Sequence, residues 1–250
     1  MIKSFFIALG LLTRIPVPKM FYVNENDSEK LFGWSVLFYP LIGLLIGGLL
    51  LLISWGLSLI NLPSHGLIEA GILLTVWILI TGALHLDGLA DSADAWLGGY
   101  GDQQRTLDIM KDPYSGPAAV VVLVITLLLK FSSLVFIQWQ VLLLAPVLAR
   151  TSVMVLLATT PYVRVGGMGE SAVQNLPKST VWIVFLTILS FSVYVLKELS
   201  VALLILFVVA YLLRRIMLKR IKGTTGDTAG AMLEVMEVSV LLVFILLMNV

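Results

Sequence analysis

The chain has 250 residues, of which 59% are hydrophobic and only 12% are charged, and its formal net charge is +1. A soluble domain carries about a quarter charged residues, so this composition excludes an ordinary soluble protein. The sequence contains no cysteine, which excludes disulfides, thiolate metal sites and a thiol nucleophile.

The chain begins with a short apolar stretch, MIKSFFIALGLLTRIPVP, at residues 1–18. It is shorter than the roughly 20 apolar residues needed to cross about 30 Å of hydrocarbon. No A-x-A-like cleavage site follows it, so we expect no cleavable signal peptide. We expect a short helix that dips into the membrane interface.

Seven longer apolar runs follow, and each is predicted to be a transmembrane helix. The fifth and sixth are short and are also compatible with a single hairpin around the sequence KELS. The pattern predicts an all-α, polytopic membrane protein with one integral membrane domain over residues 1–250. The runs cover about residues 34–60, 66–86, 117–137, 140–160, 180–196, 199–213 and 228–249.

The basic residues fall on one alternating set of loops. All Lys and Arg residues except Lys130, Arg150 and Lys197 lie before the first run, or between runs two and three, four and five, or six and seven. Cytoplasmic loops are enriched in Lys and Arg, so this pattern predicts a cytoplasmic N-terminus and an outside C-terminus. We expect a polar site that faces the cytoplasm.

Three aspartates, Asp87, Asp91 and Asp94, follow the second run in the sequence LHLDGLADSADAWLGG. Their i, i+4, i+7 spacing places them on one face of a helix. Carboxylates about 6 Å apart repel by nearly 3 kcal/mol at an effective dielectric of about 20, and no Lys or Arg occurs between Lys30 and Arg105 to offset this. Mg²⁺, which binds carboxylates together with substrate phosphates, is the cation we expect here. The alternative is a group of solvated acids at a helix end.

A second acidic set, Asp227, Glu234 and Glu237, lies in GTTGDTAGAMLEVMEV and also falls roughly on one helix face. Glu234 and Glu237 lie about two turns inside the last apolar run, where ionisable groups are costly and usually functional. Our hypothesis is that both acidic faces converge on one cavity that holds one or two cations. Alternatively, Arg150 or Lys130 neutralises the two glutamates inside the bundle.

Basic residues that could bind the phosphates of a substrate lie before the Gly-rich turn at 223–226. Arg215, Lys219 and Lys222 are spaced i, i+4, i+7, which favours a grip on a pyrophosphate assisted by backbone N–H groups of the turn. Arg14 and Lys111 are further candidates on the same side of the membrane. The alternative is that these residues orient the spans and contact anionic lipid.

The two histidines support no nucleophilic triad. His85 lies two residues before Asp87, where it is compatible with a packed, hydrogen-bonding side chain and with a proton carrier. His65 falls in an outside loop, away from the cytoplasmic acids. A direct, metal-assisted displacement on phosphorus therefore fits better than a covalent intermediate.

Five stretches resemble, in order and spacing, the cobalamin synthase or adenosylcobinamide-GDP ribazoletransferase family. This chain departs from the family after Asp112, where it has Pro113 and Tyr114 instead of a serine followed by a polar or basic residue. The stretches are LLTRIPVP at 11–18, FYPLIGLLIGG at 38–48, TGALHLDGLADSADAW at 81–96, IMKDPYSG at 109–116 and GTTGDTAGAMLEVMEV at 223–238.

The resemblance implies a Mg²⁺-dependent enzyme of the inner membrane. In that reaction, α-ribazole or its 5′-phosphate attacks the phosphorus bonded to cobinamide in adenosylcobinamide-GDP. GMP leaves, and adenosylcobalamin or its 5′-phosphate forms. The carboxylates would hold Mg²⁺ on the pyrophosphate, and the basic groups would neutralise the leaving nucleotide. Asp94 is our first candidate for the base that takes the ribose hydroxyl proton, and Asp91 is the other candidate catalytic residue.

Two other functions are weighed against this one. CDP-alcohol phosphotransferases also use several aspartates near a helix end, but their pattern begins D-G-x-x-A-R, and this chain has Asp91 and Ser92 where alanine and arginine would stand. A divalent-cation transporter would place ionisable residues at mid-depth in several spans, whereas these acids cluster on one side. The expected partners are the two substrates and the lipid bilayer, with no nucleic acid. A homo-oligomer is compatible with the sequence.

Overall fold

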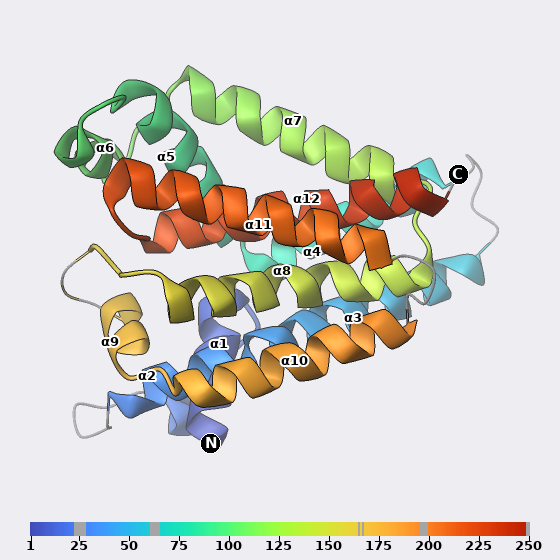
Figure 1. Ribbon diagram of the computed structural model, residues 1–250. Helices are drawn as coiled ribbons and strands as arrows, with labels where there is room; N and C mark the ends of the chain where they lie inside the picture. Colours follow the sequence, from blue (N-terminus) through green and yellow to red (C-terminus); the bar gives the residue numbers. More distant parts are fainter. Residues whose placement is uncertain (23–28, 61–65, 165, 167, 196–199, 249–250) are drawn as a thin grey trace.

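Long apolar runs of the sequence fold into helices that lie side by side in a bundle, with short helices gathered at one end (Figure 1). The computed structural model describes residues 1–22, 29–60, 66–164, 166, 168–195 and 200–248. Within these ranges there are helices and no β-strand, apart from one isolated bridge between Tyr162 and Thr224. The all-α prediction is confirmed.

Six helical segments in the described part of the chain are long and apolar enough to cross a membrane. The sixth predicted run ends too early, because its helix continues to Ile221 and carries the basic residues that were expected to follow it. The KELS connection at 196–199 and His65 lie outside the described residues. The six segments are α2 with α3 (Lys30–Ser35 and Tyr39–Ser58), α7 (Pro117–Leu134), α8 (Trp139–Thr159), α10 (Lys178–Val195), α11 (Ser200–Ile221) and α12 (Gly226–Met248).

The second predicted run is broken into two helices. α4 (Leu67–Thr81) and α5 (Leu84–Gly98) meet at a bend of 85°. Gly82 and Ala83 form the bend with φ angles of 62° and 57°, a left-handed conformation that residues with a side chain seldom adopt. With only 15 residues and three carboxylates, α5 cannot cross the membrane by itself, and it lies at one end of the bundle (Figure 1). Counting α4 and α5 as one span gives the seven predicted spans.

The remaining helices are short. The predicted N-terminal helix is present as α1 (Ile2–Leu12), and α6 (Gln103–Ile109) and α9 (Met168–Gln174) connect longer helices. Two 3₁₀ turns, η1 (Lys19–Phe21) and η2 (Val36–Phe38), complete the described elements. In Figure 1, α6 and α9 lie at the same end of the molecule as α5.

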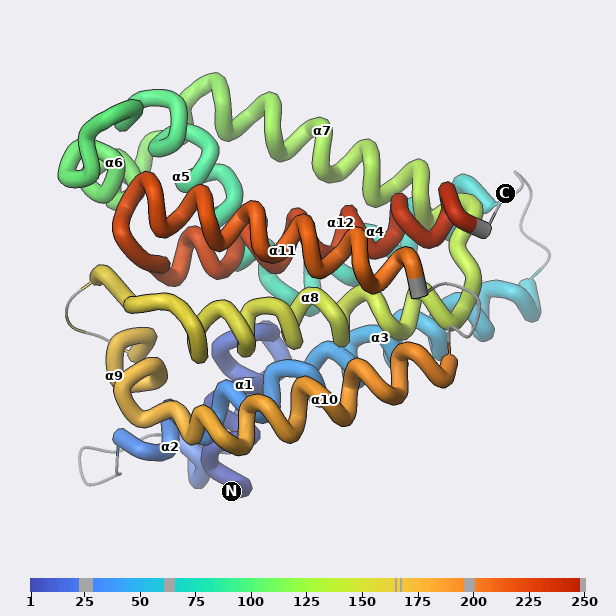
Figure 2. Tube along the Cα trace, in the orientation of Figure 1, coloured from blue at the N-terminus to red at the C-terminus, as the bar shows by residue number. Residues whose placement is uncertain are grey.

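α3 and α8 make the most extensive contact between helices, and α12 packs on α5 and α8 (Figure 2). α3 and α8 lie close together because of Gly43 and Gly47. A Cβ atom at these positions would lie 2.5 Å from the carbonyl oxygen of Pro146 and 2.6 Å from that of Leu143. Small residues four apart let two membrane helices approach this closely.

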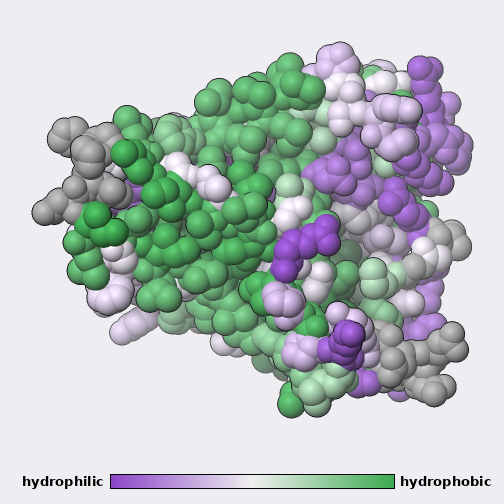
Figure 3. Space-filling model, turned by 180° about the vertical axis from the view of Figure 1, so that it is seen from behind, coloured by the Kyte–Doolittle hydropathy of each residue, from purple (hydrophilic) through white to green (hydrophobic). Residues whose placement is uncertain are grey.

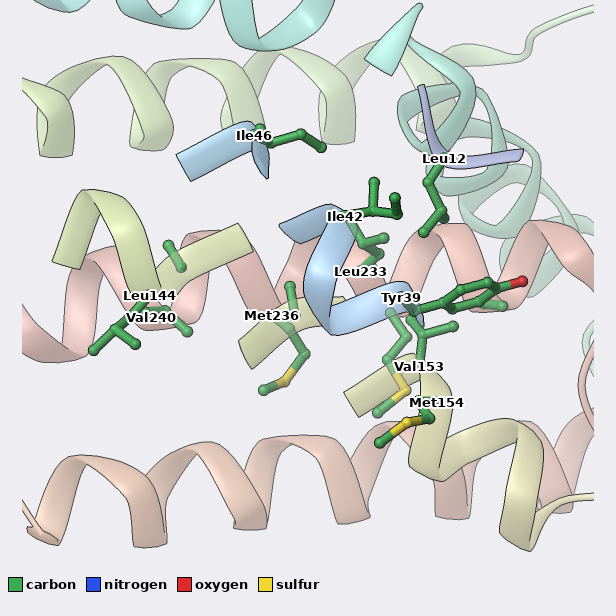
Figure 4. Close-up of a cluster of buried hydrophobic side chains, with 14 of the residues drawn as sticks. Leu12, Tyr39, Ile42, Ile46, Leu144, Val153, Met154, Leu233, Met236 and Val240 are labelled. Carbon is green, nitrogen blue, oxygen red and sulfur yellow. The ribbon is translucent and has the colours of Figure 1, made fainter. Parts of the chain in front are cut away.

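The apolar core is built where α3, α8 and α12 meet (Figure 4). It includes Ile42 and Ile46 of α3, Met154 of α8, and Leu233 and Met236 of α12, all buried. Outside this core the surface is also largely apolar, and hydrophilic side chains gather at the end of the bundle that contains α6 and α9 (Figure 3). An apolar surface with one polar end is that of a multi-pass membrane protein.

Candidate active site

The N-terminal end of α12 lies directly against α5 at the polar end of the bundle. A Cβ atom at Gly88 would lie 2.7 Å from the carbonyl oxygen of Asp227 and 3.0 Å from its Cα atom. Gly88 is therefore a point at which the backbones of the two helices touch. This contact brings Asp227, which is 136 positions later than Asp91 in the chain, to the acidic face of α5. Of the second acidic segment, Asp227 therefore lies beside the aspartates of α5.

The electrostatics of Asp91 show how crowded with negative charge this face is. Partial burial, together with the Asp87, Asp227 and Asp94 carboxylates, raises the pKa of Asp91 to about 6, and Arg164 acts in the opposite direction. Asp87, one turn earlier on α5, is exposed. Like charges in a partly buried site favour a cation between them. We call Asp87, Asp91 and Asp227 the acid cluster.

Arg164 is the basic partner of the acid cluster. Its Nη2 atom donates to the Oδ2 atom of Asp227 at 2.7 Å, and both side chains are partly exposed. Two backbone hydrogen bonds hold the arginine there, because the loop after α8 pairs with the turn before α12. Thr224 N–H donates to the carbonyl of Pro161, and Val163 N–H donates to the carbonyl of Thr224.

A reciprocal cap fixes the first turn of α12 and so the position of Asp227. Thr228 N–H donates to the Thr225 hydroxyl at 3.2 Å, and Thr225 N–H donates to the Thr228 hydroxyl at 2.9 Å. This is a capping box in which a second threonine takes the usual place of glutamate or glutamine. The sequence TTGDT therefore encodes both the helix start and the acidic residue placed on its first turn.

Asp94, on the last part of the same α5 face, accepts hydrogen bonds from the start of α7. Its Oδ2 atom accepts from Gly116 N–H at 2.5 Å, and its Oδ1 atom accepts from Ala119 N–H at 3.0 Å. These N–H groups lack partners inside their own helix, and a carboxylate at a helix N-terminus satisfies them. The structure thus gives Asp94 a role in positioning α7 against α5.

Glu234 and Glu237 lie away from the acid cluster and are paired inside the bundle. Lys130 Nζ of α7 lies 2.6 Å from Glu234 Oε2 and 2.5 Å from Glu237 Oε2, and Arg150 Nη1 of α8 lies 2.6 Å from Glu237 Oε1. All four side chains are buried. This is the alternative arrangement that the sequence left open, in which Lys130 and Arg150 neutralise the glutamates. We call these four residues the buried ion cluster.

The predicted phosphate-binding residues lie at several places on the polar end. Arg215 and Lys219 are exposed on α11, and Lys222 is exposed at the following turn with a φ angle of 63°. Arg14 runs beside Gly82 at the bend between α4 and α5, and Lys111 is exposed in the loop before α7. None of the five has a hydrogen bond to the acid cluster within the described residues.

Arg220 has a structural contact that the sequence did not indicate. Its guanidinium donates to the backbone carbonyl of Trp96 and lies over the rings of Trp96 and Tyr100. α11 is thereby tied to the end of α5. Together with the Asp94 contacts to α7, this fixes the end of the helix that carries Asp87 and Asp91.

The donor set of the acid cluster fits Mg²⁺ by its chemistry, since all three residues offer hard carboxylate oxygens. In the described part of the chain, no three His, Asp or Glu side chains are gathered tightly enough to ligate one ion without rearrangement. Mg²⁺ usually binds through one or two carboxylates plus waters and substrate phosphates, so a preformed cage of three is not required. Asp87, Asp91 and Asp227 are the residues that would hold it.

The fold and the acid cluster define a polytopic membrane protein with a convergent carboxylate site at one end of its helical bundle. Comparison with known proteins narrows this class. The chain belongs to the cobalamin-5-phosphate synthase family, whose sequence profile matches residues 4–245. The resemblance noted from the five sequence stretches is therefore confirmed.

Several relatives align with nearly the whole chain. A protein of Pseudomonas fluorescens is 46% identical over 240 residues, covering 94% of this chain and 96% of that protein. A protein of Pseudomonas putida is 50% identical over 242 residues, covering 95% and 96% respectively. Both are named adenosylcobinamide-GDP ribazoletransferase, as is a relative from Stutzerimonas stutzeri that is 48% identical over 240 residues. No solved structure matches the chain.

Sequence reasoning missed Arg164 as part of the site. The residue was visible as one basic residue of a loop on the expected cytoplasmic side, but its pairing with Asp227 depends on the contact between residues 161–163 and Thr224. A contact between two loops that are this far apart in the chain leaves no periodic pattern in the sequence. Tyr162, whose hydroxyl interacts with Arg164 and Asp227, was missed for the same reason.

Proposed function

We propose that this protein transfers the adenosylcobinamide-phosphate group of adenosylcobinamide-GDP to α-ribazole or its 5′-phosphate, with release of GMP. The single observation that carries this is the family match over residues 4–245, because it includes every helix that forms the acid cluster. The relatives named above are named for this reaction, and the chain aligns with almost their whole length.

The acid cluster supports Mg²⁺ as the cofactor. Bound there, Mg²⁺ would neutralise the pyrophosphate and polarise the phosphorus that is attacked. Asp87, Asp91 and Asp227 would bind the ion, and Arg164 would hold Asp227 in position through its hydrogen bond. Glu234 and Glu237 are left out of this set, because Lys130 and Arg150 already engage them.

The proton of the attacking ribose hydroxyl needs an acceptor. Asp94 and Asp91 were the two predicted residues, and this stays a prediction. Of the two, Asp91 is the better placed, since both oxygens of Asp94 already accept backbone N–H groups at the start of α7. Arg215, Lys219, Lys222, Lys111 and Arg14 stay candidates for contact with the diphosphate or with anionic lipid.

We place the protein in the inner membrane, with its N-terminus and the acid cluster on the cytoplasmic side. The support is the charge pattern of the loops, because the basic residues gather at the end that also contains α5 and α6. A homo-oligomer stays compatible with this arrangement.

The test is GMP release by the purified protein in lipid, from adenosylcobinamide-GDP and α-ribazole, with and without Mg²⁺. We expect Mg²⁺-dependent GMP together with a cobalamin product, and loss of both in the Asp91→Ala variant. A folded protein that releases no GMP would contradict the assignment. Cation flux through liposomes would then test the transporter alternative.

A further inference from the structure

A partly open cavity of about 330 Å³ lies beside the acid cluster, lined by residues of α1, α3, α5, α8, α9 and α12. It shares two helices with the cluster, since its wall includes His85, two residues before Asp87, and Gly226, the residue before Asp227. Much of the remaining wall is apolar and includes Leu12 (Figure 4). Its size and apolar lining are those of small-molecule sites.

Three polar side chains line this cavity: Tyr39, His85 and Tyr162. His85 is only 7% exposed, and its Nδ1 atom is buried without a hydrogen-bond partner in the described part of the chain. Because Nδ1 itself has almost no exposed surface, a ligand in the cavity would meet the part of the imidazole that lies in the cavity wall. In Figure 4, the Tyr39 hydroxyl points away from the apolar cluster around Ile42.

The cavity adjoins the acid cluster at Tyr162. The Tyr162 hydroxyl interacts electrostatically with Arg164 and Asp227, the two residues of the ion pair at the site. Its ring lies against Gly169 of α9, where a Cβ atom would come within 2.4 Å of the ring. A ligand in the cavity could therefore extend past Tyr162 toward the carboxylates.

We propose that this cavity binds the heteroaromatic base of the ribazole substrate, with the His85 imidazole hydrogen bonded to the free ring nitrogen of that base. The proposal rests on the proposed function and names the place of one of its two substrates. With the base in the cavity, the ribose extends past Tyr162, and its hydroxyl reaches the phosphorus held at the acid cluster.

The chemistry of the cavity wall favours the ribazole base over guanine and over a lipid acyl chain. A benzimidazole base is a flat, apolar ring with one free ring nitrogen, which matches an apolar wall with few polar groups. Guanine carries donors and acceptors along several edges, and many of them would be unpaired here. A lipid acyl chain would fill the apolar part but offers no polar atom to His85, Tyr39 or Tyr162.

The test compares two nucleosides in two forms of the enzyme. One nucleoside is α-ribazole, and the other is the matched α-indole nucleoside, which has carbon in place of the free ring nitrogen. We expect the wild type to prefer α-ribazole about tenfold in kcat/KM, as one buried hydrogen bond would give. In His85→Leu the preference should vanish, through loss of the α-ribazole rate alone. The KM for adenosylcobinamide-GDP should stay unchanged.

A merely structural His85 would give a different result, because both nucleosides would then be affected equally. Equal loss for the two nucleosides, or equal rates with them in the wild type, would overturn the proposal. If the wild type releases no GMP at all, it is the proposed function that has failed. An active wild type with no preference refutes the cavity assignment alone.

A second variant keeps the proposal testable if His85→Leu does not fold. Ala172→Phe, on α9, adds a ring at the cavity wall and should raise the KM for α-ribazole about tenfold or more. Val124→Phe, on the exposed face of α7, adds a similar ring outside the cavity and should leave that KM unchanged. Equilibrium dialysis of α-ribazole alone should show the same difference. Unaltered α-ribazole binding in folded Ala172→Phe would overturn the proposal.

Discussion

Gly88 of α5 and Asp227 of α12 are in backbone contact, and this contact assembles the acid cluster from two segments far apart in the sequence. A side chain at position 88 cannot be accommodated by a flexible neighbour, since the atoms it would meet belong to the backbone of Asp227. The distance between the Asp227 carboxylate and those of α5 therefore depends on the absence of one methyl group.

The Gly88→Ala variant tests this contact. We expect α5 and α12 to move apart, and GMP release to fall by about tenfold or more, because small displacements of catalytic groups are costly. Gly48→Ala is the matched control, since a Cβ atom at Gly48 meets nothing within 4 Å. The control should keep wild-type activity. Equal activity of the two folded variants would mean that the contact does not set the site geometry.

Asp94 and Asp91 should separate into a structural and a functional residue. Asp94→Asn weakens two hydrogen bonds to the start of α7, and we expect a loss of about 1–2 kcal/mol in the free energy of unfolding. Asp91→Asn removes a carboxylate that is crowded by like charges, so stability should be kept or raised while GMP release falls on the order of 100-fold. Thermal unfolding in detergent and the GMP assay measure the two effects. An activity loss of the same size in Asp94→Asn would restore it as the catalytic base.

Arg164 and Asp227 should behave as one unit. Arg164→Gln and Asp227→Asn should each lower GMP release about 10- to 100-fold, as loss of a metal ligand or of the group that orients it does. GMP release by the double variant should be little lower than that of the less active single variant, because either change already breaks the pair. If the two effects multiply instead, the residues act independently and Arg164 serves the substrate rather than Asp227.

Lys130 should be essential for stability rather than for chemistry. Lys130→Met leaves Glu234 and Glu237 with only Arg150 as a partner, and breaking a buried ion pair costs about 3–5 kcal/mol. We expect a marked fall in the midpoint of thermal unfolding, with partial recovery when Glu234→Gln is added. A folded, fully stable Lys130→Met protein would show that the buried ion cluster contributes little to the fold.

The sequence was sufficient to predict most of the membrane-spanning helices and the shared face of two aspartates on α5. Apolar length located the long helices, and helical spacing placed Asp87 and Asp91 on one face of α5. The bend at Gly82 and Ala83 was not predictable, because Ala83 has a side chain and adopts a left-handed conformation only in its tertiary setting.

The sequence also could not show which groups pair with the acidic side chains. Both pairings of Glu237 were open, with a metal or with Lys130 and Arg150, and only the packing of α7, α8 and α12 distinguishes them. Likewise, Asp94 shares a helix face with Asp91, yet its oxygens are engaged by a helix that begins more than twenty residues later. Spacing within one helix says nothing about which neighbour reaches it.

The buried ion cluster also has a consequence for biogenesis. A chain made from its N-terminus delivers Lys130 and Arg150 to the bilayer before Glu234 and Glu237 have been synthesised. Until α12 arrives, two cations are without their counterions in an apolar phase, where charge is costly. The last helix, α12, therefore completes the neutralisation of α7 and α8, which enter the membrane well before it.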